Sequence, residues 1–165
     1  MAPGEQQAAA AISAIVAAAN AAGIDTVALR AAVARVGELP FDSDRKRMTT
    51  VHALANSEQS VVRNLIATVA PGAPYLAVTK GSVDGLLDLS SHVWVDGRRE
   101  PMSAAFRARI EQANRSLAEN GMRVLGAAFK ALDTPVAGPE LETGLSFIGF
   151  TGIIEADELV VDYIA

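Results

Sequence analysis

Helical and strand-like patterns alternate unevenly along this chain, and their order constrains the fold more than any other feature. Runs of β-branched or alternating apolar residues predict strands. The clear runs are residues 47–54, 61–69, 75–79, 92–95, 122–132 and 144–154. Turn signals at residues 71–74 and at Asp96-Gly97 predict tight connections, so hairpins are expected beside the second and fourth runs. We therefore predict a mixed, largely antiparallel sheet and not a doubly wound parallel one.

Helices are predicted where apolar residues recur at helical spacing, and three of the four predicted helices begin at a capping residue. These stretches are residues 8–22, 25–36, 82–90 and 103–120. Asp25 or Thr26 is the expected cap of the second helix. The last is the clearest, because its apolar residues share one face and Gly121 supplies a stop. The face consists of Phe106, Ile110, Ala113 and Leu117. With about six strands, such helices make an α+β fold.

The composition argues against several classes of protein. A net charge of −5 disfavours a nucleic-acid binder. The lack of cysteine excludes disulfides and thiolate metal sites, and His52 and His92 are too few and too far apart to suggest zinc or iron. Residues 8–22 are alanine-rich and too short to span a bilayer. We expect residues 1–165 to form a single domain, with residues 155–165 as an added edge strand.

Two segments together suggest a site for a flat, negatively charged ligand. The first places Phe41 beside the cationic run 45–47, and the second ends strand 75–79 on Lys80 and Gly81. An aromatic face can stack on a base, cations can hold phosphates, and glycine lets the backbone approach closely. A nucleotide is therefore the expected ligand.

Each of these residues also has a plain structural interpretation. Phe41 could be a core residue at a strand entrance, and Lys80 with the following glycine could form a strand-to-helix turn. The run 45–47 could be a solvated turn, with only one of its side chains facing the pocket. Glu140 and Glu142 lie in a loop, so we expect both carboxylates to be solvated.

No catalytic residue or metal ligand is predicted. Residues 144–149 space two glycines like a phosphate-binding loop, but Phe150 stands where that loop requires lysine. Ser90, Ser91 and His92 are residue types of a hydrolytic triad, yet adjacency in sequence is not triad geometry. Hydrolysis by the chain alone is therefore not expected.

Several short motifs follow one another through residues 36–154. They are LPFDSDRKRM at 39–48, TKG at 79–81, DG at 96–97, PM at 101–102, GMRVLG at 121–126 and TGLSFIG at 143–149. In this order and spacing, they resemble the nucleotide-binding (N) domain of P-type cation-transporting ATPases, especially the calcium-pump-like branch. The resemblance extends through more than two thirds of the chain.

The resemblance implies an ATP site at matched positions. Phe41 would stack on adenine, and Arg123 would reach the phosphates. The base and ribose pocket would be formed by Lys46, Met48, Lys80 and Gly81. Arg123 could instead be a surface residue paired with Glu119 or Asp133. The chain also departs from the family at Ala8, where an acidic residue usually contacts the adenine end.

The resemblance further implies that the chain is a cytoplasmic domain of a membrane pump. The phosphorylation motif Asp-Lys-Thr-Gly is absent from the sequence, so an aspartate on a separate phosphorylation domain would receive the γ-phosphate. The implied partners are ATP, Mg²⁺ accompanying the nucleotide, and the phosphorylation and actuator domains. We expect no contact with nucleic acid or membrane, a monomer in isolation, and no catalysis by the chain alone.

The alternative is a domain of the same fold that has lost nucleotide affinity and serves as an interaction or regulatory module. Ala8 and the altered tail after residue 154 favour this alternative, whereas Phe41, Lys80 and Arg123 oppose it.

Overall fold

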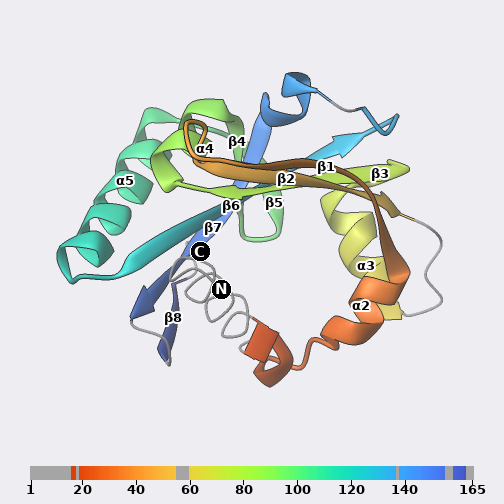
Figure 1. Ribbon diagram of the computed structural model, residues 1–165, viewed down its shortest axis with the longest axis horizontal. Helices are drawn as coiled ribbons and strands as arrows, with labels where there is room; N and C mark the ends of the chain where they lie inside the picture. Colours follow the sequence, from red (N-terminus) through yellow and green to blue (C-terminus); the bar gives the residue numbers. More distant parts are fainter. Residues whose placement is uncertain (1–15, 18, 55–59, 137, 155–157, 163–165) are drawn as a thin grey trace.

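A mixed β-sheet forms the centre of the molecule (Figure 1). The computed structural model describes residues 16–17, 19–54, 60–136, 138–154 and 158–162. Within them the sheet has eight strands in the order β1-β2-β3-β6-β7-β4-β5, and β8 pairs with β7. The strands are β1 (Val33–Asp42), β2 (Arg47–Leu54), β3 (Tyr75–Gly81), β4 (Ser90–Val95), β5 (Arg98–Pro101), β6 (Arg123–Leu132), β7 (Leu145–Ile154) and β8 (Glu158–Asp162). Only the β4–β7 pair is parallel among these strands, which confirms the predicted α+β fold with a largely antiparallel sheet.

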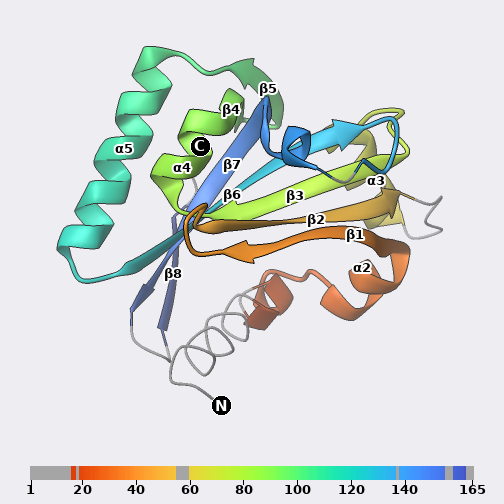
Figure 2. The same ribbon diagram turned by 45° about the horizontal axis from the view of Figure 1, so that its top comes forward.

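Helices lie on both sides of this sheet. They are α2 (Thr26–Ala32), α3 (Ser60–Val69), α4 (Val83–Leu89) and α5 (Ala104–Glu119), with a short 3₁₀ helix, η1 (Pro139–Glu142). Figure 2 shows α4 and α5 beside each other on one side and α2 on the other. The main core lies under α4 and α5, where Leu86 and Ile110 pack with Phe147 of β7, each fully buried.

The predicted amphipathic helix is confirmed as α5. Its cap is Ser103, whose Oγ accepts a hydrogen bond from the Phe106 amide at 3.1 Å. Gly121 follows with a φ of 77°, the left-handed conformation that glycine adopts readily. The four predicted apolar residues all pack in the core, and Ile110 is 0% exposed.

The strand predicted at residues 61–69 is wrong, because this segment forms helix α3. Its β-branched content favours a strand, but Val62, Ile66 and Val69 also recur at the spacing of one helix face. The turn at residues 71–74 consequently joins a helix to β3, so no hairpin exists there.

The second predicted helix is shorter than expected and is followed by a strand that was not predicted. Asp25 caps α2 through bonds from two backbone amides, but the helix ends at Ala32. From Val33 the chain pairs with β2 along the length of β1. Pro40 lies in an irregularity of this pairing, where its missing N–H costs little.

The ends of the chain are described only in part. The helix predicted at residues 8–22 lies mostly outside the described residues, as does Ala8 itself. At the other end, β8 pairs antiparallel with residues 150–154 of β7. The single-domain organisation of the chain stays a prediction. In the described part of the chain, no helix is long and apolar enough to cross a membrane.

Candidate functional site

Phe41 stands at the end of β1, just before the turn that leads into β2. Its side chain is 65% exposed, which argues against the interpretation as a core residue. Asp42 closes the turn, because its Oδ1 accepts hydrogen bonds from the amides of Asp44 and Arg45 at 2.9 Å each. The amide of Arg45 in particular lowers the pKa of the Asp42 carboxyl. The turn therefore holds an aromatic side chain in solvent on a defined backbone.

The end of β3 packs against this turn at Gly81. A Cβ atom at residue 81 would lie 2.6 Å from the Lys46 carbonyl oxygen and 2.5 Å from the Arg47 Cβ. The Ser82 amide also donates to that Lys46 oxygen at 3.1 Å, and Lys46 itself has a φ of 52°. Only glycine permits so close an approach, so Gly81 joins the two predicted motifs in space.

Three of the predicted ligand-binding side chains share one face of the sheet. Met48 of β2 lies directly opposite Lys80 of β3, which lies opposite Ala127 of β6, and directly opposed residues point to the same side. Strand alternation places Leu125 and Arg123 on that face, with Arg123 about 13 Å along β6 from Ala127. Met48 and Lys80 are half-buried, and Arg123 is exposed.

Phe41 and Lys46 stand on the turn at the end of this face, and both are exposed. The structure thus brings Phe41, Lys46, Met48, Lys80 and Gly81 to one end of the sheet, with Arg123 farther along β6. Within the described residues, Arg123 forms no ion pair, so the alternative pairing with Glu119 or Asp133 is not observed.

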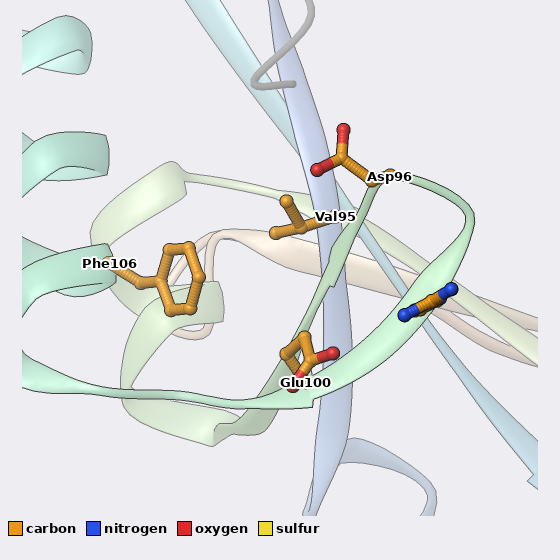
Figure 3. A pocket seen from close by; sticks show the side chains of 5 residues that line it. Val95, Asp96, Glu100 and Phe106 are labelled. Carbon is orange, nitrogen blue, oxygen red and sulfur yellow. The ribbon is translucent and has the colours of Figure 1, made fainter.

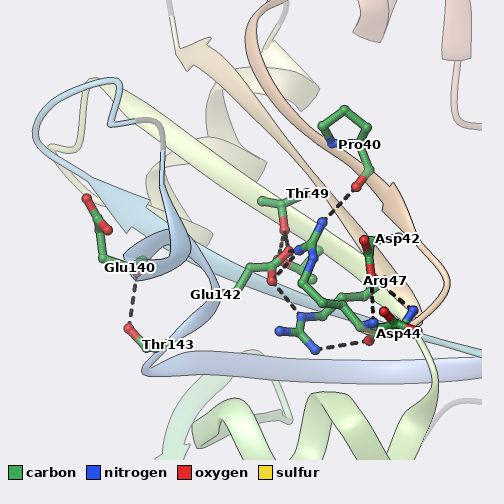
Figure 4. Close-up of polar contacts among 10 residues, drawn as sticks. Pro40, Asp42, Asp44, Arg47, Thr49, Glu140, Glu142 and Thr143 are labelled. Carbon is green, nitrogen blue, oxygen red and sulfur yellow. Dashed lines mark hydrogen bonds and ion pairs between the residues drawn. The ribbon is translucent and has the colours of Figure 1, made fainter.

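A buried carboxylate lies behind the turn, on the opposite face (Figure 4). Glu142 of η1 is 2% exposed, so the prediction that this residue is solvated is wrong; Glu140 is exposed, as predicted. Arg45 Nη1 donates to both Glu142 carboxylate oxygens at 2.8 and 2.7 Å, and Arg47 Nε donates to Oε2 at 2.6 Å. Thr49 Oγ1 donates to Oε1 at 2.8 Å.

Opposing effects act on the pKa of Glu142. Burial raises the pKa of this carboxyl, but the hydrogen bonds from Arg45, Thr49 and Arg47 together outweigh it, so the net pKa lies below the ordinary value. The hydrogen bond between Arg45 and Glu142 raises the pKa of the Arg45 guanidinium. The cluster is therefore ionised and paired, as a buried charge must be.

Sequence reasoning missed Glu142 because its partners are 95 and 97 residues away. The two arginines of the run 45–47 are visible in the sequence, but Arg45 lies in the turn and Lys46 has a φ of 52°, so strand alternation does not predict that both side chains converge on one anion. The prediction that one residue of the run 45–47 faces the pocket remains compatible with this arrangement, in which Lys46 is the exposed cation.

A mostly apolar cavity of about 880 Å³ lies on the face of the sheet that carries Lys80, toward the end away from the turn of residues 42–47. Its lining includes Leu76 and Val78 of β3, together with Phe129 and Trp94, whose rings meet edge to face at 5.6 Å. None of the predicted ligand-binding residues lines it.

A second hollow of about 470 Å³ lies between the β4–β5 hairpin and α5. Figure 3 shows Phe106 of α5 facing the hairpin residues Val95 and Glu100. Its charged lining residues, Asp96, Arg98 and Glu100, are all exposed. No group of His, Asp or Glu residues that could hold a metal ion is found in the part of the chain that the structure describes.

Comparisons with known proteins identify the family to which this chain belongs. The family described as P-type ATPase, cytoplasmic domain N, matches residues 9–156, and the chain belongs to it. Among its relatives is calcium-transporting ATPase 1 of Bacillus cereus, 36% identical over 122 residues, which cover 73% of this chain and 12% of that protein. The calcium-transporting ATPase lmo0841 of Listeria monocytogenes is 29% identical over 144 residues, 86% of this chain and 14% of the relative.

A calcium-transporting ATPase of Bacillus subtilis is 29% identical over 123 residues, 73% of this chain and 12% of the relative. The chain thus spans 12–14% of the length of these three relatives. The predicted identity as a calcium-pump-like N domain is confirmed.

Proposed function

We propose that this chain is the ATP-binding domain of a P-type cation pump. It holds adenine against Phe41 and presents the γ-phosphate to an aspartate on a separate phosphorylation domain. The observation that carries the proposal is the 65% exposure of Phe41 on a turn whose backbone is fixed by Asp42 and packed against Gly81. An exposed aromatic ring on a preorganised backbone costs little to order when a base stacks on it.

The positions of Met48, Lys80 and Arg123 along one face of the sheet suit an extended nucleotide. Stacking on Phe41 contributes about 1–3 kcal/mol by analogy with base stacking in nucleic-acid complexes. Lys80 and Met48 line the start of the face, and Arg123, about 13 Å along β6, offers forked donors to phosphate oxygens. The base lies at the Phe41 end and the phosphates point toward Arg123.

Mg²⁺ fits this site as a companion of ATP. In phosphate sites Mg²⁺ keeps several waters and binds phosphate oxygens with one or two carboxylates, so a dedicated protein cage is not required. The predicted nucleotide-binding side chains on this face are cationic or apolar, so they suit a nucleotide that brings its own metal ion. The ion would supply charge neutralisation of the phosphates.

The chain binds and orients ATP, and the chemistry belongs to other domains. Phosphoryl transfer depends on an acceptor aligned with the γ-phosphate. In this proposal the acceptor lies on the phosphorylation domain, and the actuator domain is a further partner in the parent pump. The isolated chain therefore binds ATP without turnover.

The alternative function is a nucleotide-free interaction or regulatory module of the same fold. Two observations favour it: Ala8 replaces the family's acidic residue, and the apolar cavity of about 880 Å³ is lined by none of the predicted nucleotide residues. A single binding experiment separates the two functions.

That experiment is a calorimetric titration of the chain with Mg-ATP. We expect saturable binding, and the dissociation constant should rise about five- to 150-fold in Phe41→Ala, the equivalent of a lost stacking contact. Lys80→Ala should also weaken binding. Matched controls are Val27→Ala, an exposed apolar residue on α2, and Arg98→Ala, an exposed cation at the β4–β5 turn; both should bind like the parent. Absence of saturation at millimolar ATP would favour the interaction module.

A further inference from the structure

We propose that Glu142 is a positioning residue for the nucleotide, holding the turn of residues 42–47 from the far side of the sheet. The inference rests on the proposed ATP site at Phe41 and extends it to a residue that touches no ligand. Glu142 is the buried acid in this part of the structure, and its hydrogen bonds all lead to the turn and to β2.

The loop that carries Glu142 is itself anchored, so it can act as a fixed point. Lys130 Nζ of β6 donates to the carbonyl oxygens of Glu140 and Thr143 at 2.9 Å each. Leu141 is 1% exposed and packs with Val51 of β2. The carboxylate between these attachments is therefore presented to the turn from a packed base.

Arg45 transmits this anchor to Phe41. Its Nη1 donates to Glu142, while its Nη2 donates to the Pro40 carbonyl oxygen at 2.8 Å. One guanidinium thus joins the buried carboxylate to the residue immediately before Phe41. The backbone of Arg45 also leads directly into Lys46, so the residues on both sides of the turn depend on the same planar group.

Other contacts keep the turn folded without Glu142, which separates positioning from folding. The Asp42 carboxylate still closes the turn, and the Ser82 amide still holds the Lys46 carbonyl oxygen. Loss of the Glu142 charge would release the Arg45 side chain, which is already 32% exposed, into solvent. The segment around Phe41 then becomes less ordered, and ATP must order it on binding.

The test compares Mg-ATP affinity in the parent, Glu142→Gln, Phe41→Ala and the double variant. Glu142→Gln keeps the side-chain shape and removes the charge, and we expect the dissociation constant to rise about two- to tenfold. In the Phe41→Ala background the same change should have a smaller effect, because its route to the ligand is gone. Arg45→Lys keeps the charge, loses the forked contact and should weaken ATP binding similarly; it also serves if Glu142→Gln fails to fold.

The control for general destabilisation is Ile110→Val, a cavity-forming change in the core under α5, away from the turn. Measured well below its melting temperature, it should bind ATP like the parent. An unchanged dissociation constant in Glu142→Gln, or an equal loss with and without Phe41, would overturn the positioning role.

Backbone amide order parameters of residues 42–47, recorded without ATP, distinguish failure of this inference from failure of the proposed function. We expect lower order in Glu142→Gln than in the parent and no change in Ile110→Val. If the parent binds no ATP, the nucleotide proposal fails, while lower order in Glu142→Gln still supports control of the turn. Unchanged order would overturn that control whether or not ATP binds.

Discussion

Gly81→Ala should destabilise the domain because the turn of residues 42–47 leaves no room for a methyl group. The added Cβ would lie 2.6 Å from the Lys46 carbonyl oxygen and 2.9 Å from the Arg47 Cα, both backbone atoms that cannot rotate away. Overpacking of this kind costs about 1–3 kcal/mol. Alanine returns about 0.4–1 kcal/mol through the less flexible unfolded chain. The midpoints of these two ranges leave a fall of about 1.3 kcal/mol in the free energy of unfolding.

The assay is thermal unfolding followed by far-UV circular dichroism. For a chain of this size the expected loss lowers the melting temperature by about 3–5 °C. Gly149→Ala is the matched control, because it also replaces a glycine in a strand, but a Cβ there meets nothing within 4 Å. Its melting temperature should stay unchanged or rise slightly. The steric argument is refuted if Gly81→Ala melts at or above the parent while Gly149→Ala does not fall.

Two further predictions concern stability near the site. Phe41→Ala should change the free energy of unfolding by less than about 0.5 kcal/mol in urea titrations, because the exposed ring makes little core contact; a loss above 2 kcal/mol would show a packing role. The lowered pKa of Glu142 predicts a stabilisation that is complete above its ordinary value of 4.5 and is lost as the pH falls through the lower folded value. Between pH 5 and 3 the urea midpoint of the parent should therefore fall more steeply than that of Glu142→Gln, and parallel curves would contradict the assignment.

The parts of the fold that the sequence predicts well have local causes. β2 follows the alternating run of residues 47–54 at both ends, and α5 follows its capping serine and closing glycine. Both signals are contained in the segment itself. The errors arose where local signals conflict: α3 contains β-branched residues at helical spacing, and β1 contains Gly37 and Pro40, which disfavour a strand in isolation.

In the candidate site, too, some features are predicted by the sequence and others are revealed only by the folded chain. The resemblance to a known family grouped Phe41 and Lys80 in one expected site, and their ligand roles stay predictions. In the fold they lie on β1 and β3, with β2 between them. Gly81 is explained by a contact with Lys46 that only the folded chain reveals. Glu142 could not be found from local sequence, because its burial depends on two arginines more than ninety positions away.

The most direct test of the central claim is a titration of the isotope-labelled parent chain with Mg-ATP, followed by backbone amide chemical shifts. The account predicts saturable shifts concentrated at Phe41, Lys46, Lys80 and Gly81 and extending along β6 to Arg123. Residues of α2 and of the β4–β5 hairpin should stay unchanged. Shifts that cluster instead around the apolar cavity near Trp94 and Phe129, or none at millimolar ATP, would contradict the claim that this face holds the nucleotide.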